Sequence, residues 1–348
     1  MPKFLPLVEM TRGTVVEIIH AGAIAVVDSD GRLVASYGDP ASVANLRSSS
    51  KPFQTLPLLE SGGVEKFNLS SQEIALMCAS HSATPQHIAV LEALQQRIGI
   101  TVNDLLCGAH YPIHEESAKD MLLRGEPATA NHNNCSGKHT GMLAQARARG
   151  VEISDYTNPT HPIQQTIIQT FAEMCDLALD EVELGIDGCS APTFAVPLHN
   201  AALAYARLVD PRGIPLKTAN NLRKIARAMV EYPDMVAGPE RFDTLLMQAM
   251  NGKVVCKGGA DGYQAFGIFP GAAGSASPGL GVTIKVIDGD ASGRARPLIT
   301  LEILRQLGVI APSEQQALRR FDKRPVTNWR GIEVGVMRPV FQLDLHPQ

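Results

Sequence analysis

Ser48 and Lys51 are the first residues along the chain whose types and spacing could do chemistry, in the segment Ser-Ser-Ser-Lys at 48–51. In a helix, side chains three positions apart share a face. A serine hydroxyl is a weak nucleophile, and a desolvated lysine that has lost its proton can activate it. The spacing also arises by chance, and serines before a helix are common N-caps. The pair nevertheless indicates an acyl-transfer enzyme, with Ser48 on a tight turn because Pro52 disfavours helical backbone at Lys51.

The composition is that of a globular protein with small, weakly charged substrates. The 348 residues carry a net charge of −4 and contain no run of Lys or Arg, so nothing indicates nucleic acid or an anionic membrane as a partner. No apolar stretch suits a signal peptide or a membrane span, and a cytoplasmic location is expected. The cysteines are too sparse for a disulfide framework, which fits a reducing compartment; they stand at 78, 107, 135, 175, 189 and 256.

A second group of candidate residues lies around a predicted helix at about 139–149. Cys135 and Lys138 stand at its start, where the helix dipole favours a thiolate and a neutral amine, the forms that a metal ion binds. Cys189 follows a probable strand, two residues after Asp187. His139 is a candidate third ligand, and Asp187 a candidate fourth ligand or a partner of a ligand. Buried thiols with no metal are the competing interpretation.

A third element is Lys257, at the end of an apolar strand and followed by Gly258 and Gly259. These glycines allow a ligand to approach the backbone closely, although a surface lysine is the ordinary alternative. Ser80 lies between two predicted helices. The order of S-x-x-K, an inter-helix serine and K-x-G is similar to that in serine β-lactamases and penicillin-binding proteins.

The elements that must position these residues predict an α+β fold. Residues 14–20, 24–28 and 33–37 are expected as an antiparallel meander, and further strands follow residue 252. Helices fill the middle, including one that opens at Thr84-Pro85 and ends at Gly99 and one from 158–159 to about 175. We expect one domain, 1–348, with an antiparallel sheet lobe at 1–66 and 250–348 and a helical lobe at 67–249.

Taken together, five segments resemble the rhizobial-type, or class 3, L-asparaginase family, from about residue 10 to about residue 285. No functional motif is assigned to 290–348. The five segments are Arg47-Ser48-Ser49-Ser50-Lys51-Pro52-Phe53-Gln54, Cys78-Ala79-Ser80-His81, Asn134-Cys135-Ser136-Gly137-Lys138-His139-Thr140-Gly141, Asp187-Gly188-Cys189-Ser190-Ala191-Pro192 and Lys257-Gly258-Gly259-Ala260-Asp261-Gly262.

The resemblance implies a fold similar to serine β-lactamases and glutaminases and a homodimer that hydrolyses L-asparagine to L-aspartate and ammonia. It implies two serine-lysine tandems, which map onto Ser48 with Lys51 and onto Ser80 with Lys257. The implied zinc site maps onto three residues and leaves an open position near Asp187; its ligands are Cys135, Lys138 and Cys189.

The roles expected from this combination are specific. Lys51 would take the proton of Ser48, whose attack on the side-chain amide would give an acyl-enzyme, although the two tandems could exchange roles. Arg47 is a candidate partner for the substrate carboxylate, and His139 and Asp187 are further candidate substrate-binding residues. Zn²⁺ is expected to position substrate or to order the site. The alternatives are a β-lactam-interacting serine hydrolase and a non-catalytic zinc-dependent binding protein.

Overall fold

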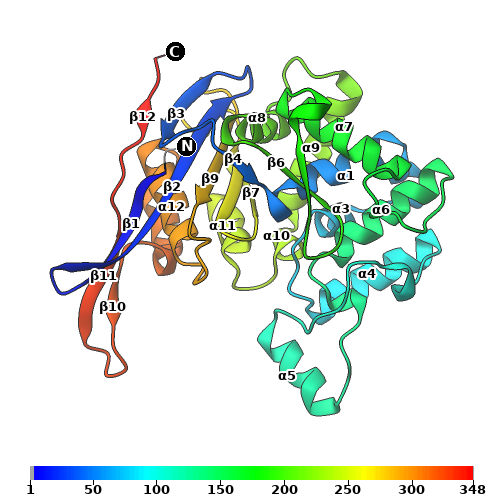
Figure 1. Cartoon of the computed structure of the whole chain (residues 1–348), viewed down its shortest axis with the longest axis horizontal. Helices are drawn as coiled ribbons and strands as arrows, with labels where there is room; N and C mark the ends of the chain where they lie inside the picture. Colours follow the sequence, from blue (N-terminus) through cyan, green and yellow to red (C-terminus); the bar gives the residue numbers. More distant parts are fainter. Residues whose placement is uncertain (1–3, 348) are drawn as a thin grey trace. The chain divides into compact units, whose positions relative to one another are not determined.

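A computed structural model describes residues 4–347, which divide into two compact units. Unit 1 contains the residues up to Leu46, Val196–Asp210 and those from Leu246 onward, and unit 2 contains Arg47–Ala195 and Pro211–Leu245. These boundaries differ from the expected ones at 66 and 249. Helix α1 (Lys51–Glu60) packs on other helices and belongs to unit 2, whereas α8 (Leu198–Val209) packs on strands and belongs to unit 1 (Figure 1).

Unit 1 is built on an antiparallel sheet of nine strands. Its central path runs β10-β11-β1-β2-β9-β8-β7, with β3 on β2 and β12 on β3. The two ends of the chain are neighbours in this sheet, because β1 pairs with β11, blue beside red in Figure 1. This confirms the expected α+β fold with a sheet made by both chain ends. The strands are β1 (Leu5–Arg12), β2 (Val15–Asp28), β3 (Leu33–Tyr37), β7 (Val254–Gly258), β8 (Tyr263–Ile268), β9 (Leu280–Val286), β10 (Arg324–Thr327), β11 (Glu333–Pro339) and β12 (Asp344–Leu345).

The expectation of separate strands at 14–20 and 24–28 is wrong. Both segments belong to the continuous strand β2, which pairs with β1 along its first half and with β9 along its second half. Gly22 lies between the segments and pairs on both sides, with Leu5 and with Val286. Pairing partners on both edges keep this glycine extended, so the small residues between the two β-branched segments do not end the strand.

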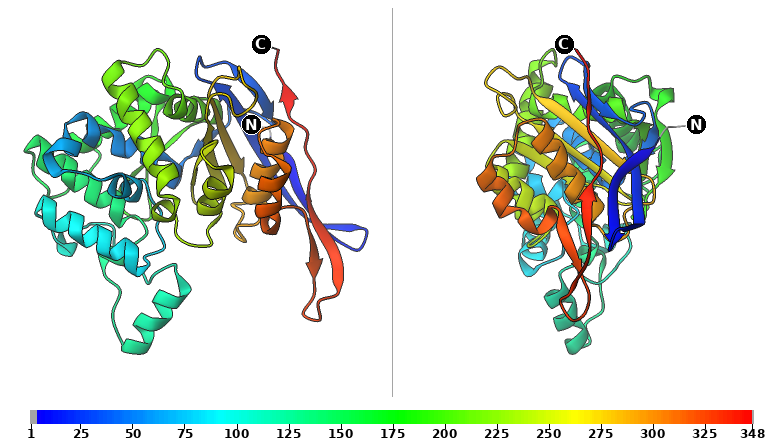
Figure 2. Two further views of the ribbon diagram at one scale, coloured as in Figure 1. Left: turned by 180° about the vertical axis from the view of Figure 1, so that it is seen from behind. Right: turned by 90° about the vertical axis from the view of Figure 1, so that its left-hand side faces the viewer.

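Helices pack on the sheet of unit 1. Helix α8 contacts β2, β8 and β9, and Gly281 of β9 permits this because a Cβ there would lie 1.8 Å from the carbonyl oxygen of Ala202. Helix α12 (Ala295–Gln306), orange in Figure 2, contacts β1, β9 and β11. The remaining elements of unit 1 are β4 (Val43–Asn45), α13 (Pro312–Ala317) and the 3₁₀ turn η5 (Arg319–Phe321).

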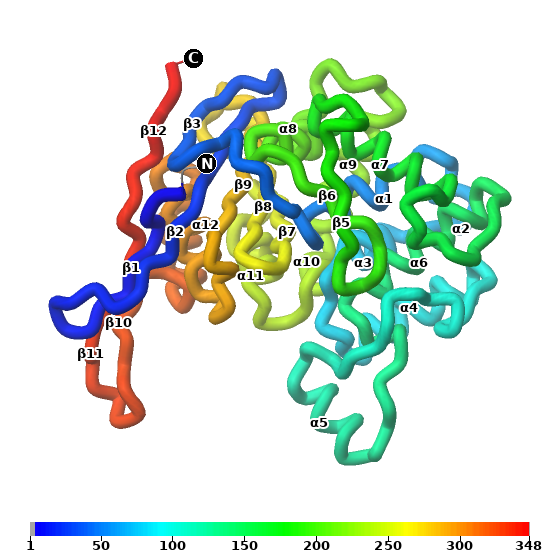
Figure 3. Tube along the Cα trace, in the orientation of Figure 1, coloured from blue at the N-terminus to red at the C-terminus, as the bar shows by residue number. Residues whose placement is uncertain are grey.

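Unit 2 is helical, with α1 against α6, α7 and α9, and α3 against α4, α6, α9 and α10 (Figure 3). Strand β5 (Glu183–Ile186) pairs antiparallel with β6 (Pro192–Pro197). The last residues of β6 belong to unit 1, and so do the last residues of α11 (Phe242–Met250). The other helices are α2 (Gly63–Phe67), α3 (Ser71–Met77), α4 (Pro85–Ile98), α5 (Glu115–Arg124), α6 (Ser136–Arg149), α7 (Pro162–Cys175), α9 (Leu216–Glu231) and α10 (Pro233–Val236), and the 3₁₀ turns are η1 (Arg47–Ser50), η2 (Val102–Asp104), η3 (Ala130–His132) and η4 (Leu179–Glu181).

Most predicted helix ends in unit 2 agree with the structure. Helix α4 begins after the Thr84 cap and ends at Gly99, whose φ of 72° is left-handed. Helix α6 starts three residues before the expected position, at Ser136. The expected start of α7 at 158–159 is wrong, because the side chain of Asn158 accepts the backbone N–H of Thr160 and folds this segment into a turn. No helix within residues 4–347 is long and apolar enough to cross a membrane.

Candidate active site

Ser48 lies in η1, the 3₁₀ turn directly before α1, as Pro52 led us to expect. Arg47, which opens the turn, has a φ of 52°, in the left-handed region that arginine rarely adopts. The Ser50 hydroxyl donates to the Arg47 carbonyl oxygen at 2.9 Å and closes the turn. Backbone strain of this kind is concentrated at functional sites, and it presents Ser48, which is half-buried, at the start of a helix.

Lys51 is fully buried, and its amine contacts Ser80. Its Nζ donates to the Ala79 carbonyl oxygen at 2.5 Å and to Ser80 Oγ at 3.0 Å, and lies 3.2 Å from Cys135 Sγ. Three acceptors match the three protons of an ammonium group. Ser48 Oγ, in contrast, has no hydrogen-bond partner within residues 4–347. The structure therefore joins Lys51 to the serine that the sequence assigned to the other tandem.

The start of α6 lies against the end of α3 because of Gly137. A Cβ at this position would lie 2.2 Å from the carbonyl oxygen of Leu76, so only glycine allows the two backbones to come this close. The approach brings Cys135, which precedes α6, beside Ala79 and Ser80, which follow α3.

Hydrogen bonds of His81 hold the same two segments together. Its backbone N–H donates to the Asn134 carbonyl oxygen at 3.2 Å, and its Nδ1 accepts the Ala83 N–H at 3.1 Å. With Nδ1 as the acceptor, Nε2 donates to Ser136 Oγ at 2.8 Å. Burial is the largest of the causes that lower the pKa of His81 well below its ordinary value, so this imidazole is neutral.

The candidate metal ligands Cys135, Lys138 and Cys189 are in mutual contact. Lys138 Nζ donates to Cys189 Sγ at 3.0 Å, and the two sulfur atoms share a hydrogen bond. That hydrogen bond, with the charges of Lys51 and Lys138, lowers the pKa of Cys135 well below its usual range. The same hydrogen bond and burial raise the pKa of Cys189. Cys135 is thus the thiolate and Cys189 the thiol that donates to it.

The prediction that Lys138 is a neutral amine is wrong when no metal is bound. Burial lowers the pKa of Lys138, but the neighbouring Cys189, Cys135 and Asp187 together outweigh burial and raise this pKa. The helix dipole that we considered is a partial charge, whereas the sulfur atoms and a carboxylate are in direct reach of the amine. Lys138 is therefore an ammonium group in a buried ion cluster.

Asp187 and Arg47 form a partly buried ion pair. Arg47 Nε lies 2.7 Å from Asp187 Oδ1, and the two side chains are 26% and 10% exposed. Burial raises the pKa of Asp187, but Lys138 and Arg47 outweigh it, so the net shift is downward and the carboxylate is ionised. Asp187 follows β5 in a turn where its N–H donates to the Ala191 carbonyl oxygen. Ser190 takes a left-handed φ of 69° in this turn, which also contains Cys189.

His139 is buried in α6 and is held by Tyr156. The Tyr156 hydroxyl oxygen accepts the Leu106 N–H at 2.8 Å and lies 2.7 Å from His139 Nδ1. The hydroxyl therefore donates to Nδ1, which leaves Nε2 as the protonated nitrogen. His139 Nε2 is buried and has no hydrogen-bond partner within the part of the chain described. An orphan donor of this kind is a candidate contact for a ligand.

Lys257 lies in unit 1, at the end of β7, and is 1% exposed. Its Nζ donates to the Gly258 carbonyl oxygen at 2.6 Å. Its expected partner Ser80 belongs to unit 2, so the second tandem remains a prediction.

The sequence did not indicate Tyr156, Asn134 or Ser136 as parts of the site. Ser136 and Asn134 flank Cys135, so their position beside a candidate residue was an available signal. Asn134 Oδ1 lies 3.3 Å from Cys135 Sγ. Tyr156 comes from a loop seventeen residues beyond His139, and no local pattern marks it.

The donor set of the sulfur cluster fits zinc. Zinc prefers thiolate sulfur and nitrogen in four-coordinate sites, and two sulfurs and one amine already meet here, away from bulk water. Within residues 4–347 no group of three or more His, Cys, Asp and Glu side chains is arranged for a metal, because the third donor here is a lysine. A bound metal would need the protons of Cys189 and Lys138 to leave.

Comparisons with known proteins found solved structures of similar fold and a matching family model. A probable glutaminase from Bacillus subtilis, complexed with 6-diazo-5-oxo-L-norleucine, is 15% identical, with a TM-score of 0.40 over 83% of this chain and 84% of that chain. A Bacillus glutaminase in 4.3 M NaCl is 14% identical, with a TM-score of 0.39 over 83% and 91% of the two chains. No curated protein matches. The family model for L-asparaginase II matches residues 8–339, and the chain belongs to this family.

Proposed function

We propose that the chain hydrolyses the side-chain amide of L-asparagine to L-aspartate and ammonia. The observation that carries the proposal is the buried contact of Lys51 with Ser80, in the same unit as the half-buried Ser48 and the Arg47–Asp187 pair. Membership of the L-asparaginase II family supports an amide hydrolase. The arrangement supplies a free hydroxyl, a group that can move protons, and charges of both signs.

The charges suit an α-amino acid. Arg47 offers a guanidinium group for the substrate α-carboxylate, and Asp187 offers a carboxylate for the α-ammonium group. His139 Nε2, a buried donor without a partner in the structure as described, would donate to the substrate. Binding both charges of the zwitterion leaves the side-chain amide to reach the serines.

Ser48 is the proposed nucleophile, because its hydroxyl makes no hydrogen bond within residues 4–347, whereas Ser80 accepts one from Lys51. Ser48 Oγ attacks the amide carbon, its proton passes through Ser80 and Lys51 to the leaving nitrogen, and ammonia departs. Water then attacks the acyl-enzyme, and the same pair returns a proton to Ser48. Lys257 would assist this hydrolysis of the acyl-enzyme. The alternative assignment exchanges the serines, since Lys51 contacts Ser80 directly.

We also propose that Cys135, Lys138 and Cys189 bind one Zn²⁺. Bound there, zinc would act as a Lewis acid and a template that orders the site. When no zinc is bound, the charge of Lys138 contributes to lowering the pKa of the Asp187 carboxylate. Zinc content by mass spectrometry of the native protein should equal one per chain and fall in Cys135→Ser.

We further propose that the protein is a cytoplasmic homodimer, with apolar side chains on two hairpins of unit 1 as the contact. A dimer would bury Trp329, the only tryptophan and fully exposed in one chain, so its emission should shift to shorter wavelength as concentration rises. Emission that is independent of concentration, with a monomer mass in solution, would contradict the proposal. The exposed side chains are Val15, Val16, Ile18 and Ile19 on β1–β2, and Trp329 and Ile332 on β10–β11.

Ammonia release from a panel of L-asparagine, L-glutamine and a β-lactam tests the function. We expect release from asparagine at least tenfold faster than from glutamine, and no acylation by the β-lactam. Bound zinc without ammonia release from either amide would instead identify a binding protein and reject the proposal.

Two serine variants test the nucleophile. Ser48→Ala should lower kcat by at least a thousandfold, as for the loss of other nucleophiles. Ser61→Ala is a control, because Ser61 only caps α1 by donating to the Leu58 carbonyl oxygen. Full turnover in Ser48→Ala together with a dead Ser80→Ala would move the assignment to Ser80.

A further inference from the structure

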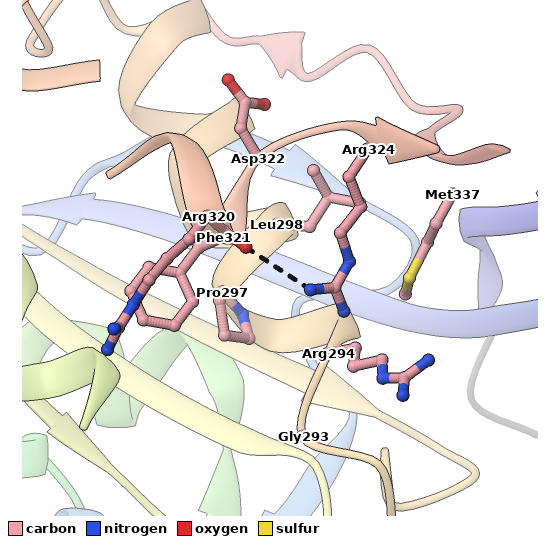
Figure 4. A pocket seen from close by; sticks show the side chains of 9 residues that line it. All are labelled: Gly293, Arg294, Pro297, Leu298, Arg320, Phe321, Asp322, Arg324 and Met337. Atoms are coloured by element: carbon pink, nitrogen blue, oxygen red, sulfur yellow. Dashed lines mark hydrogen bonds between the residues drawn. The ribbon is translucent and has the colours of Figure 1, made fainter. Parts of the chain in front are cut away.

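Unit 1 contains a cavity of about 310 Å³, and none of its lining residues is among those assigned above. Three elements form its walls: the start of α12, the turn η5, and the β10–β11 hairpin (Figure 4). Pro297 and Leu298 of α12 and Met337 of β11 give it an apolar surface. Met337 lies directly opposite Arg324 in the pairing of β11 with β10.

Positive charge dominates the lining. Arg294, Arg320 and Arg324 line the cavity, and Asp322 is the single acidic residue among the lining residues. Asp322 is already neutralised from outside the cavity, because Arg305 Nη2 contacts both of its oxygens at 3.0 and 3.1 Å. In Figure 4 the Asp322 carboxylate points away from the guanidinium groups of Arg294 and Arg324.

Arg294 and Arg324 form no ion pair with any residue within 4–347. The side chain of Arg324 donates only to the Arg320 carbonyl oxygen, at 3.4 Å. Burial and the charge of Arg294 lower the pKa of Arg324, which means that the two cations repel each other across the cavity. Arg320 lies over the ring of Phe321, 4.7 Å from its centre, which holds a third guanidinium group at the rim.

We propose that this cavity binds a small oxoanion with at least two negative charges, a phosphate group or a dicarboxylate. Guanidinium groups bind such oxygens in pairs of parallel hydrogen bonds, and Arg294 and Arg324, which form no ion pair within residues 4–347, both line this cavity. The apolar wall of Pro297, Leu298 and Met337 would contact the carbon part of an organic anion. An anion would supply Arg294 and Arg324 with the compensating charge that residues 4–347 do not provide for these two side chains.

Isothermal titration calorimetry of the whole protein tests the proposal, with inorganic phosphate and succinate as probes. Potassium chloride at equal ionic strength gives the baseline. Arg324→Gln should weaken binding at least tenfold, whereas Arg319→Gln, an exposed neighbour in η5 that does not line the cavity, should leave it unchanged.

Each outcome bears on the proposal. Binding of phosphate alone, or of succinate alone, supports it and identifies the class of anion. Binding of neither probe above the chloride baseline overturns it, as does equal binding in Arg324→Gln and Arg319→Gln. If Arg324→Gln does not fold, Arg294→Gln replaces it. Arg294 is exposed, and the hydrogen bond from its backbone N–H to Asp290 Oδ1 does not depend on its side chain.

Discussion

The two units surround their basic side chains in opposite ways. In unit 2, Lys51 and Lys138 are buried, and each has acceptors from its own chain: a carbonyl oxygen, a hydroxyl, sulfur atoms and a nearby carboxylate. In unit 1, Arg294 and Arg324 line a cavity and have no carboxylate partner within residues 4–347.

The pKa shifts of Lys138 and Arg324 differ in direction between the two units. The pKa of Lys138 is raised because its anionic neighbours outweigh burial, whereas the pKa of Arg324 is lowered by burial and by Arg294. A cation whose charge is balanced by neighbouring groups of its own chain is held in a fixed position, where it can act on a substrate. A cation without compensation is stabilised by a ligand. Substitutions in the two units should therefore differ in sign as well as in size.

The largest effect is expected for Lys51→Met. This change removes the amine that contacts Ser80 and Cys135, and kcat for asparagine should fall by about a thousandfold, in the range for a lost proton-transfer group. Steady-state ammonia release measures it. Lys66→Met is the control, because Lys66 contacts only backbone carbonyls and the Phe67 ring at the surface, away from the candidate residues. A kcat within threefold of wild type would show that Lys51 is not catalytic.

Lys138→Met should cost up to about 3 kcal/mol of unfolding free energy in protein without zinc, because it removes one of the two cations beside each anion and leaves Cys135 with Lys51 alone and Asp187 with Arg47 alone. Urea unfolding in the presence of a chelator gives the value. Lys119→Met, at an exposed position of α5, should change stability by less than about 0.5 kcal/mol. Equal losses in both variants would contradict the compensated cluster.

His87 is a buried basic side chain of a third kind, because it is neutral in the folded chain near pH 7. Its Nδ1 accepts the Thr84 N–H and its Nε2 donates to the Asp234 carbonyl oxygen, and burial is the main cause that lowers its pKa to about 4. The unfolded chain takes up this proton near pH 6.5. Stability should therefore fall by about 3 kcal/mol as the pH drops from 6.5 to 4, and be insensitive to this group above 6.5.

Denaturation at pH 5 and pH 7.5 should show about 2 kcal/mol of this loss, because pH 5 lies above the pKa of His87 in the folded chain. His87→Gln keeps a capping side chain at the same position of α4, and its stability should fall less on acidification than that of wild type. His81 and His139 also have lowered pKa values, so part of the acid sensitivity will persist. An unchanged difference between the two pH values would exclude His87 as a source.

The smallest effect is expected for Arg294→Gln in a buffer without multivalent anions. Removing one of two repelling cations should raise the unfolding free energy by a few tenths of a kcal/mol, the scale of exposed charge pairs. High salt should remove the gain by screening. A loss of stability at low salt would show that Arg294 has a partner and would break the contrast between the units.

The amino-acid sequence by itself determined the local structure and the inventory of reactive groups. Turn and cap residues such as Pro52, Thr84 and Gly99 act within a few positions, so the start of α1 and both ends of α4 were predictable. The same holds for the candidate residues of the site, because the five segments that contain them are contiguous in the chain.

The tertiary structure alone decided which of these groups meet. Lys51 reaches Ser80 and Cys135 across 29 and 84 positions, and the approach depends on the missing side chain of Gly137 against Leu76. The charge of Lys138 and the cavity between Arg294 and Arg324 also depend on partners that are distant in the sequence. Local patterns carry no distances, whereas hydrogen bonds and charges act over a few ångströms, so only packing could select these contacts.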